Sequence, residues 1–272
     1  TLLSGMLVSG YDFLRNPIEG LTYKTWFMPN TLLRSPIASD RLSFLPMSWT
    51  QTLTYLLSID VDAVLCSVAP GEKGDRYSLG ISASYVLPVA RKARRVIAEV
   101  NPQVPWTEGA VLERSAFDAL IPVDYALPVF PTRATDVDGE RAARLVADLI
   151  PHGTTVQPGV GAIPNRVMEL LGERPEGVRV HSMVTDGCMN AIDKAYHGAG
   201  TVAHVGEIIG SQKLYDWVRG HPGVRMCSAE QTHTLAAILE LGPFVSINSA
   251  LEVDLFGQAN SEIINGVQSG AI

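Results

Sequence analysis

Two turns in the sequence carry residues whose types and spacing could support chemistry. In "QPGVGAIPN" (157–165), Gly159 and Gly161 lie between an apolar strand and a helix opened by Pro164. Glycine lets a ligand approach the backbone closely, and the start of a helix offers N–H groups and the positive end of a dipole. The turn is neither a Walker loop nor a GxGxxG fingerprint. It indicates a ligand-binding turn, and a purely structural turn is an equal alternative.

The second turn, "INSALEVDLFGQANSE" (247–262), begins directly after a buried strand. The side-chain amide of Asn248 could point into a cleft there, with Glu252 and Asp254 close behind it. A carboxamide both donates and accepts hydrogen bonds, so it suits the recognition of a carbonyl group. The alternative interpretation is that these polar residues only form a turn.

His181 lies in a strand predicted over 178–183, on the face opposite Val180 and Ser182. A single histidine in a strand is more often a hydrogen-bonded core residue than a catalyst, and both interpretations stay open. The other histidines show no HxH or HExxH spacing, so no metal site is expected. The sequence also lacks a GxSxG segment, which argues against an ordinary serine hydrolase.

Composition excludes several classes of function. Hydrophobic residues make up 46% of the 272 residues, and 21 basic against 28 acidic side chains give a formal net charge of −7. A nucleic-acid partner is not expected, because phosphate binding requires a basic face. No apolar run reaches the length of about 18 residues that a membrane span needs, so no membrane partner is expected.

The cysteines indicate a reducing compartment. Cys66, Cys188 and Cys227 are far apart, and an odd count without CxxC spacing predicts a cytoplasmic location. No signal peptide is recognisable. We expect truncation or trimming at both ends, because the sequence begins at Thr1 rather than Met and stops at Ile272 after a glycine.

The order of the predicted elements indicates an α/β fold with largely parallel sheets. A strand, a glycine-containing loop and a helix recur along the chain, which is typical of this class. Apolar character lapses over 130–139, so two domains are predicted, over 1–135 and 136–272, while residues 1–50 read as mixed. Strands are expected over 61–69, 153–157, 178–183 and 244–249, and helices over 85–100, 140–150, 164–171 and 188–195, with "VIAEV" (96–100) as a candidate strand.

Two predicted helices have faces that can be assigned. The helix over 140–150 is amphipathic and stops before Pro151. The helix over 85–100 carries a basic cluster, which is either a solvated surface or a contact for an anionic cofactor tail. The apolar face of the first comprises Ala142, Leu145, Val146, Leu149 and Ile150, and the basic cluster of the second comprises Arg91, Lys92, Arg94 and Arg95.

Segments along almost the whole chain form a combination that is more specific than any one of them. They are "FLPMSW" (44–49), "VDAVLCSVAP" with "YSLGIS" (61–82), "RRVIAEVNPQVP" (94–105), "TTVQPGVGAIPN" (154–165), "VHSMVTDG" (180–187), "GSQKLYDWV" (210–218) and "VSINSALEVDLFGQAN" (245–260). Together they resemble the class I coenzyme A transferases, in the acetyl-CoA hydrolase/transferase branch that includes 4-hydroxybutyrate and acetate CoA-transferases. The resemblance implies two similar α/β domains with the active site between them, and a homo-oligomer. Acyl-CoA and a small carboxylic acid would be the substrates, and neither NAD nor a metal is expected.

The resemblance also implies a mechanism. A glutamate carboxylate attacks an acyl-CoA thioester, the released CoA thiolate converts the resulting anhydride to a glutamyl-CoA thioester, and a second carboxylic acid collects the CoA. Each step passes through a tetrahedral oxyanion that fixed donors can stabilise. By this resemblance the catalytic residues are Asn248 (an oxyanion donor), His181, Ser182, Met183 and Asp186, and the cofactor-binding residues are Gln157, Gly159, Val160, Gly161, Glu252, Met47 and Ser48.

The sequence departs from the family pattern at the strand that should carry the nucleophile. The pattern there is His, a small polar residue, Glu, an apolar pair, Ser or Thr, Asp and Gly, whereas His181 and Ser182 run directly into Met183. The segment is one residue short, and the absent residue is the glutamate. A Gly-Asp pair (74–75) also replaces the usual His-Gly, and family members continue past "VQSGAI" (267–272) into a glycine-rich CoA-binding stretch.

Three explanations remain for the missing carboxylate. It can be present in the protein but omitted from the sequence, or modified. The chain can instead be a natural variant that uses CoA esters without it, as an acyltransferase or a hydrolase, or a binding relative without catalysis. In a variant, Cys188 at a helix start, where a thiolate is stabilised, is a candidate acyl acceptor, with Glu252 in a supporting role.

Overall fold

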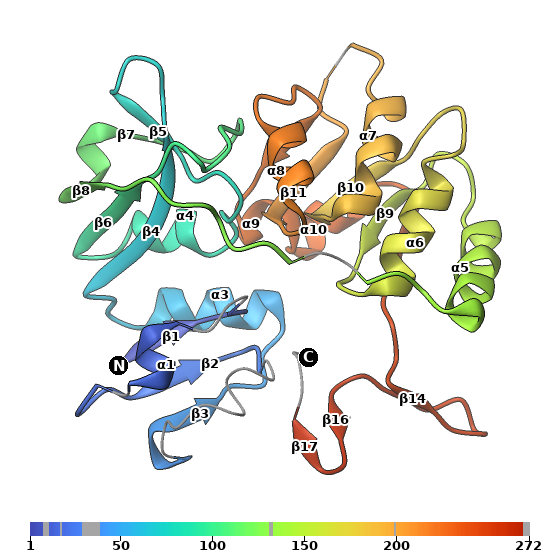
Figure 1. The fold of residues 1–272 in the computed structure, drawn as a ribbon, viewed down its shortest axis with the longest axis horizontal. Coiled ribbons are helices and arrows are strands. Elements are labelled where there is room, and N and C mark those ends of the chain that lie inside the picture. The colour runs from blue at the N-terminus through green and yellow to red at the C-terminus, as the bar shows by residue number, and fades with distance from the viewer. Residues whose placement is uncertain (8–10, 17, 29–38, 131–132, 199, 269–272) are drawn as a thin grey trace. The chain divides into compact units, whose positions relative to one another are not determined.

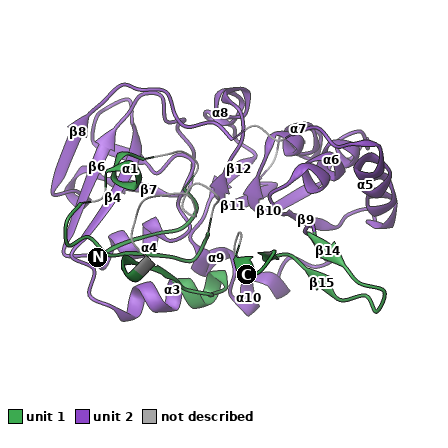
Figure 2. Ribbon diagram, turned by 60° about the horizontal axis from the view of Figure 1, so that its bottom comes forward, with its two compact units in different colours: residues 1–52, 250–272 green, residues 53–249 purple. Residues whose placement is uncertain are grey.

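The chain divides into two units in the computed structural model, and Figure 2 distinguishes them by colour. One unit comprises residues 1–52 and 250–272, and the other comprises residues 53–249. The domain boundary expected after residue 135 falls inside the larger unit and stays a prediction. The structure describes residues 1–7, 11–16, 18–28, 39–130, 133–198 and 200–268.

The first of two five-stranded sheets in the larger unit is mixed (Figure 1). Its elements are β4 (Ala63–Pro70), β5 (Arg76–Ser78), α4 (Val86–Ala90), β6 (Arg95–Val100), β7 (Val111–Glu113), η2 (Arg114–Ala116) and β8 (Ala119–Pro122). In the order β7-β5-β4-β6-β8, β4, β6 and β8 are parallel, whereas β5 pairs antiparallel with β4 and β7.

Two sequence predictions for this sheet need correction in part. The strand over 61–69 is confirmed as β4, but it is not buried throughout, since Leu65 is 67% exposed. The helix over 85–100 is confirmed only at its start, because α4 ends at Ala90 and the segment "VIAEV" belongs to β6. The β-branched residues of that segment suit the paired strand better than a helix.

The second five-stranded sheet is entirely parallel. Its strands, in the order β12-β11-β10-β9-β13, are β9 (Thr155–Pro158), β10 (Arg179–Val184), β11 (Ala203–Ile208), β12 (Val224–Met226) and β13 (Phe244–Ile247). The predicted strands over 153–157, 178–183 and 244–249 are thereby confirmed. The chain moves outward from β9 to β12 and then returns to place β13 on the other side of β9. In open parallel sheets, ligands bind outside the carboxyl ends of the strands at such a reversal of strand order.

Helices connect the strands of the second sheet. They are α5 (Val137–Leu149), α6 (Ala162–Leu171), η3 (Asp186–Cys188), α7 (Met189–Ala195), α8 (Gln212–Val218), α9 (Ala229–Thr232) and α10 (Leu235–Leu239). The helices predicted over 140–150, 164–171 and 188–195 are confirmed as α5, α6 and α7. Pro164 lies in the first turn of α6, where a missing backbone N–H removes no helical hydrogen bond.

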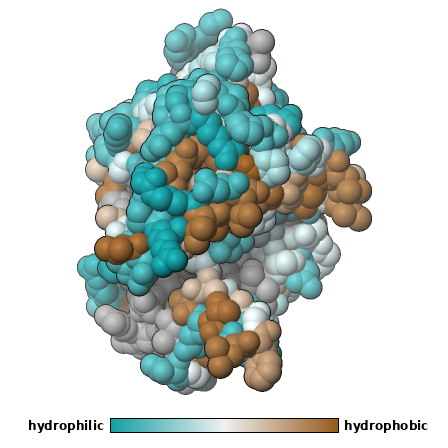
Figure 3. Space-filling view, turned by 90° about the vertical axis from the view of Figure 1, so that its right-hand side faces the viewer, coloured by the Kyte–Doolittle hydropathy of each residue, from teal (hydrophilic) through white to brown (hydrophobic). Residues whose placement is uncertain are grey.

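The apolar face predicted for α5 is only partly right: Ile150 is buried and Val146 packs against the core, but both leucines of that face lie at the surface. Leu145 is 58% exposed and Leu149 is 80% exposed, whereas Gly139, Ala143 and Ala147 are buried. Because α5 packs against α6, small residues on the contact face let the two helix backbones approach closely. Figure 3 views the side of the molecule that carries α5 in Figure 1 and shows apolar surface among polar side chains.

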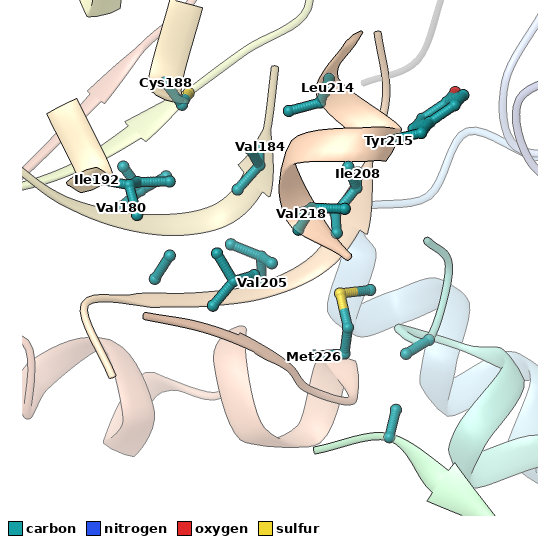
Figure 4. Close-up of a cluster of buried hydrophobic side chains, with 14 of the residues drawn as sticks. Val180, Val184, Cys188, Ile192, Val205, Ile208, Leu214, Tyr215, Val218 and Met226 are labelled. Atoms are coloured by element: carbon teal, nitrogen blue, oxygen red, sulfur yellow. The ribbon is translucent and has the colours of Figure 1, made fainter. Parts of the chain in front are cut away.

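A buried core packs against the second sheet. Figure 4 shows Val180 and Val184 of β10 beside Ile192 of α7 and Leu214 of α8, and all four side chains are buried. Full burial of an aliphatic side chain contributes about 1.5–3 kcal/mol relative to its exposure. The strands are therefore held firmly up to their carboxyl ends.

The two sheets are joined along one edge of β11. Residues 81–84 run antiparallel beside the end of this strand, with a bridge between Ser82 and Glu207. The amide of Ala83 donates to the carbonyl oxygen of Gly206 at 2.8 Å. Because β12 pairs only with the first half of β11, the segment that follows β5 continues that edge.

The smaller unit contains a three-stranded parallel sheet and two hairpins. Its elements are β1 (Leu2–Ser4), α1 (Asp12–Arg15), β2 (Tyr23–Thr25), η1 (Ser39–Arg41), β3 (Leu42–Phe44), β14 (Glu252–Val253), β15 (Ala259–Asn260), β16 (Ile263–Ile264) and β17 (Val267–Gln268), and α3 (Trp49–Ser58) continues into the larger unit. Residues 269–272 of the final segment lie outside the described residues. Within the described parts of the chain, no helix has the length and apolarity needed to cross a membrane.

Candidate active site

The candidate site lies at the carboxyl ends of β9 and β13, where the strand order reverses. The backbone N–H of Gly159 donates to the carbonyl oxygen of Ile247 at 2.8 Å, which holds these two strand ends together. A Cβ atom added to Gly159 would lie 2.2 Å from Oδ1 of Asn248. Only glycine therefore lets the Asn248 carboxamide lie over the turn. The structure brings the two residues together, while their roles in binding and catalysis stay predictions.

The donors at this turn differ in what they can offer a ligand. The Gly159 amide is engaged by Ile247 and belongs to the sheet. The exposed Asn248 side chain donates through Nδ2 to Oγ of Ser246 at 3.3 Å. A carboxamide carries two N–H donors, so this bond uses half of its donor capacity. Asn248 is thus the stronger candidate for contacting a substrate oxygen.

Gly161 leads the turn into α6. Its φ of +149° is one that side chains rarely adopt, and it occupies the N-cap position of the helix. The amide of Asn165 donates to the Gly161 carbonyl oxygen at 3.2 Å, which closes the first helical turn. Val160, between the two glycines, is 37% exposed. The turn therefore presents backbone and one apolar side chain at the surface.

Ser182 breaks the regular alternation of β10. Its φ is +71°, which is uncommon for a residue other than glycine. Its Oγ lies 3.2 Å from Nε2 of His233, and the ring of His181 lies 5.6 Å from the ring of His233. The expectation that His181 and Ser182 point to opposite faces is therefore wrong, because the left-handed backbone at Ser182 turns its hydroxyl to the same side.

The pairing of β10 with β11 is irregular at the same point. Ser182 is opposite Val205 and Met183 is opposite Glu207, so Gly206 has no opposing residue in β10. The irregularity falls between Ser182 and Met183, where the family pattern places a glutamate. A strand with a further residue at this position would oppose Gly206.

His181 has the partners of a hydrogen-bonded core histidine. It is 2% exposed, and burial lowers its pKa, so the ring is neutral at pH 7. Its Nε2 donates to the carbonyl oxygen of Thr232 at 3.1 Å. Oε1 of Gln157 lies 2.9 Å from Nδ1. A ring with its proton on Nε2 has only a lone pair on Nδ1, so this amide must be turned over to present its NH2 group there. The catalytic roles of His181 and the binding role of Gln157 stay predictions.

Asp186 joins two turns at the end of the sheet. The backbone N–H of Ser211 donates to its Oδ2 at 3.0 Å, and the Ser211 hydroxyl donates to its Oδ1. Ser211 also caps α8 by accepting from the amide of Leu214 at 3.4 Å. Asp186 therefore positions the start of α8 relative to the end of β10, and its catalytic role stays a prediction.

The structure contradicts a thiolate role for Cys188. The side chain is fully buried among the apolar residues of Figure 4, and burial raises the pKa of its thiol to about 11. Burial also raises the pKa of the Cys66 thiol to about 12. The position of Cys188 at a helix start is confirmed, but desolvation outweighs the helix dipole.

Sequence reasoning missed Glu207. This carboxylate accepts from the Ser84 hydroxyl, and burial raises its pKa to about 7. A carboxyl group with such a pKa is only partly ionised at neutral pH, which is a property of many functional sites. The signal in the sequence was a single acidic residue inside the apolar segment "HVGEIIG" (204–210).

Three predicted binding residues belong to the smaller unit. Ser48 caps α3, because its Oγ accepts from the amide of Gln51 at 3.4 Å while Gln51 Oε1 accepts from the Ser48 amide at 2.9 Å. Glu252 accepts from the Asn260 side chain at 2.8 Å, and Met47 is half-buried. Their roles in cofactor binding stay predictions.

The basic cluster near α4 has structural partners. Lys92 donates to the carbonyl oxygens of Leu57, in the last turn of α3, and of Ile59, directly after it, and Arg94 pairs with Asp62 at 3.0 Å. These contacts favour the interpretation of a solvated surface, although the cluster follows α4 and does not lie on a helix face. Among the described residues, no group of three or more His, Cys, Asp or Glu side chains could hold a metal ion.

Comparisons with known proteins add a family relationship. Residues 210–272 match the model of the acetyl-CoA hydrolase/transferase C-terminal domain. The chain is 32% identical over 245 residues to 4-hydroxybutyrate coenzyme A transferase of Clostridium kluyveri, which covers 85% of this chain and 56% of that protein. It is 29% identical over 265 residues to butyryl-CoA:acetate CoA-transferase of Anaerostipes caccae, with 91% and 58% covered. The chain thus spans little more than half the length of these curated relatives.

A solved structure supports the same relationship. The crystal structure of 4-hydroxybutyrate CoA-transferase from Porphyromonas gingivalis superposes with a TM-score of 0.72 and 27% identity, covering 89% of this chain and 65% of that chain. The predicted α/β class with largely parallel sheets is confirmed by the fold and by this superposition.

Proposed function

Because this chain belongs to the acetyl-CoA hydrolase/transferase family, we propose that it moves coenzyme A between an acyl-CoA, such as acetyl-CoA, and a small carboxylic acid. The names of two relatives support the proposal, since one is a 4-hydroxybutyrate coenzyme A transferase and the other a butyryl-CoA:acetate CoA-transferase. Coenzyme A enters and leaves as a substrate, and no atom changes its oxidation state.

The observation that carries this proposal is the contact of Asn248 with Gly159 at the reversal of strand order. A thioester carbonyl at this edge would meet a carboxamide donor and the positive end of α6. When a nucleophile attacks the carbonyl carbon, negative charge develops on the oxygen, so a fixed donor there stabilises the transition state more than the ground state. The arrangement therefore suits acyl transfer.

A glutamyl intermediate is the finer part of the proposal. A carboxylate with little hydration is a better nucleophile than one in bulk water. The family pattern puts this glutamate between Ser182 and Met183, and the unopposed Gly206 at the same level supports a strand that is longer by that residue. The residue would then lie on the strand adjacent to the glycine turn.

Intact-mass measurement and isotope exchange test the transferase. After incubation of the full-length protein with acetyl-CoA, we expect a mass increase equal to one CoA minus one water, as acetate is released and the thioester forms. We also expect inactivation by borohydride that depends on the thioester. Labelled acetate should enter acetyl-CoA, and a panel of acetate, butyrate and 4-hydroxybutyrate should identify the acceptor. If acetyl-CoA binds but neither a CoA adduct nor exchange is found, the transferase mechanism is wrong.

A second candidate, acyl-CoA hydrolysis, is favoured by the direct succession of Ser182 and Met183. Without the glutamate, water would accept the acyl group, and CoA would be released as the free thiol and not passed to a second carboxylic acid. The same assay separates the two candidates, because a hydrolase releases free CoA without exchanging labelled acetate. A relative that only binds CoA esters would gain thermal stability from them and show neither reaction.

We also propose a homo-oligomer located in the cytoplasm. The three cysteines are free thiols in the structure, which suits a reducing compartment. Light scattering on the purified protein should give a mass of at least twice that of the chain. A monomer at micromolar concentration would contradict the oligomer.

A further inference from the structure

A serine and a histidine from distant parts of the chain are in hydrogen-bonding contact at the carboxyl end of β10. Oγ of Ser182 lies 3.2 Å from Nε2 of His233, and 51 residues separate them along the chain. We propose that Ser182 is a nucleophile and His233 its base, and that together they cleave an acyl-CoA thioester with water. The proposal deepens the proposed function and rests on the binding of an acyl-CoA at this edge of the sheet.

The register of the sheet places the pair next to the glycine turn. Val180 of β10 is opposite Val156 of β9. Ser182 comes two residues after Val180, as Pro158 comes two residues after Val156, and Gly159 follows Pro158. An acyl group over the glycine turn would therefore lie at the level of the Ser182 hydroxyl.

The backbone at Ser182 is adapted to aim this hydroxyl. A positive φ in a residue other than glycine is unfavourable, and such conformations gather at functional sites. The φ of +71° turns the side chain toward α9, where His233 follows the helix. A regular strand would point Ser182 away from His181 and hence away from His233.

The hydrogen bonds of His233 determine which of its nitrogens accepts. The Thr232 hydroxyl donates to the carbonyl oxygen of Ser228 at 3.1 Å, so its oxygen accepts from Nδ1 of His233 at 2.8 Å. A neutral imidazole with its proton on Nδ1 has its lone pair on Nε2, the atom that faces Ser182. Thr232 thus holds the orienting position that a third group occupies in nucleophile–base sites.

The protonation state also suits a base. Burial, together with the neighbouring His181, lowers the pKa of His233 to about 4, so the ring is neutral throughout the physiological range. Its low basicity predicts a slow hydrolase rather than a fast one, because a base works best with a pKa near the operating pH. His233 is half-buried and Ser182 is 4% exposed, so the pair lies at the border between core and surface.

The reaction balances without any further reactant than water. Oγ of Ser182 attacks the thioester carbon while its proton moves to Nε2 of His233. The carbon–sulfur bond then breaks, and the CoA thiolate takes that proton and leaves as the thiol. Water attacks the acyl ester of Ser182 and gives a proton to His233, which returns it to Oγ as the carbon–oxygen bond breaks. The products are CoA, the carboxylate and one proton.

Ser182→Gly is the decisive variant, because glycine accepts the φ of +71° and lacks only the hydroxymethyl group. Its control is Ser58→Ala, which removes a hydroxyl from the exposed end of α3. With the full-length protein, CoA release from acetyl-CoA should fall by about 10²-fold or more in Ser182→Gly and remain at the parental rate in Ser58→Ala. Hydrolysis at the parental rate in a folded Ser182→Gly protein would overturn the proposal, as would a parent that releases no CoA.

A second pair of variants tests the base. His233→Gln should lower the hydrolysis rate by about 10²-fold. The control is His152→Gln, because His152 is an exposed histidine that contacts Glu176, and this variant should hydrolyse acetyl-CoA at the parental rate. The tryptic peptide 180–194 from acid-quenched reactions should carry an acetyl group on Ser182, and a label on Cys188 in its place would contradict the assignment.

Binding of a non-hydrolysable CoA thioether distinguishes a failure of the serine–histidine pair from a failure of the proposed function. If the parent binds this analogue and exchanges acetate, but hydrolysis does not depend on Ser182 or His233, only the serine–histidine pair is wrong. If the parent does not bind the analogue, the proposed function and the pair fail together. Equal binding in parent and Ser182→Gly, with loss of hydrolysis, supports both.

Discussion

The two five-stranded sheets of the larger unit differ in connectivity, and only one of them ends in a candidate site. In the first sheet, β5 turns back and pairs antiparallel with the end of β4, Ala69 opposite Ser78, so the chain itself covers that strand end. In the second sheet every pair is parallel; β9 and β13 end in the turns that hold Gly159 and Asn248, and Ser182 lies two residues before the end of β10. An α/β fold alone does not create the candidate site. The site requires parallel strands whose carboxyl ends lie together next to the point where the strand order in the sheet reverses.

Restoring the missing residue tests this comparison with the largest expected effect. Inserting one glutamate between Ser182 and Met183 should give Gly206 an opposing residue, relax the positive φ of Ser182 and supply the carboxylate of the family pattern. We expect acetate exchange into acetyl-CoA to appear or rise sharply. Inserting glutamine is the matched control, because it restores the register without a nucleophile. Equal exchange in both insertions would exclude a glutamyl intermediate at this position.

Crowding the glycine turn should have the next largest effect. Gly159→Ala places a methyl group 2.2 Å from Oδ1 of Asn248, so the carboxamide must move. Loss of a fixed oxyanion donor typically costs about 10²-fold in rate, and we expect kcat/KM with acetyl-CoA to fall by that order.

Gly80→Ala provides the control beside the first sheet, since its Cβ would lie 2.2 Å from Cγ1 of Val104. It should lower the melting temperature but leave the activity of the folded protein unchanged. If both variants lose activity in proportion to their stability, Asn248 has no special role.

The carboxyl group of Glu207 should make stability depend on pH. Its folded-state pKa of about 7 exceeds the ordinary value of 4.5, so its favourable contribution is complete below about pH 4.5 and is lost as the pH rises to 7. Glutamine cannot ionise, so Glu207→Gln should be about 2 kcal/mol more stable than the parent at pH 8; this value is reduced because solvent partly screens the carboxylate. Near pH 4.5 the two proteins should be equally stable.

Urea unfolding at the two pH values measures this difference. The control is Glu113→Gln in the first sheet, an exposed residue that pairs with Arg76 and should shift stability little at either pH. If the difference in free energy of unfolding between Glu207→Gln and the parent is the same at both pH values, ionisation of the buried carboxylate does not destabilise the folded protein.

The smallest expected effect is on the free energy of unfolding, when a buried side chain of one sheet and an exposed side chain of the other are substituted. Val156 in β9 is 0% exposed, and Val156→Thr should cost about 1.5 kcal/mol because it buries a hydroxyl group among apolar atoms. Leu65→Thr in β4 should change the free energy of unfolding by less than about 0.5 kcal/mol, because that side chain is already 67% exposed. Similar costs in the two variants would mean that both sheets are equally covered.

The sequence predicted the elements better than their faces. Apolar runs with β-branched residues identified β9, β10 and β13, and the proline in the first turn identified the start of α6. The predicted face of α5 was wrong in part, because hydrophobicity favours Leu145 and Leu149, whereas close helix packing selects the small Ala143 and Ala147.

The candidate site was predictable only where it is local in sequence. The glycine turn and Asn248 each follow a strand, so their neighbours in the chain point to them. His233 could not be found in this way, because its contact with Ser182 depends on a positive φ, on the position of α9 and on the hydrogen bonds of Thr232. The environment of Cys188 was missed for a similar reason, since burial by α7 and the sheet appears only in three dimensions.

Because residues 81–84 hydrogen-bond to the end of β11, the earlier part of the chain completes the edge of a sheet built by the later part. A fragment beginning at residue 136 would leave bare amide and carbonyl groups along that edge, which readily attract a strand from another molecule. Produced alone, such a fragment should associate with itself. Produced together with residues 1–135, it should recover a folded heterodimer, so the protein lends itself to a split reporter whose two pieces recognise each other through backbone pairing.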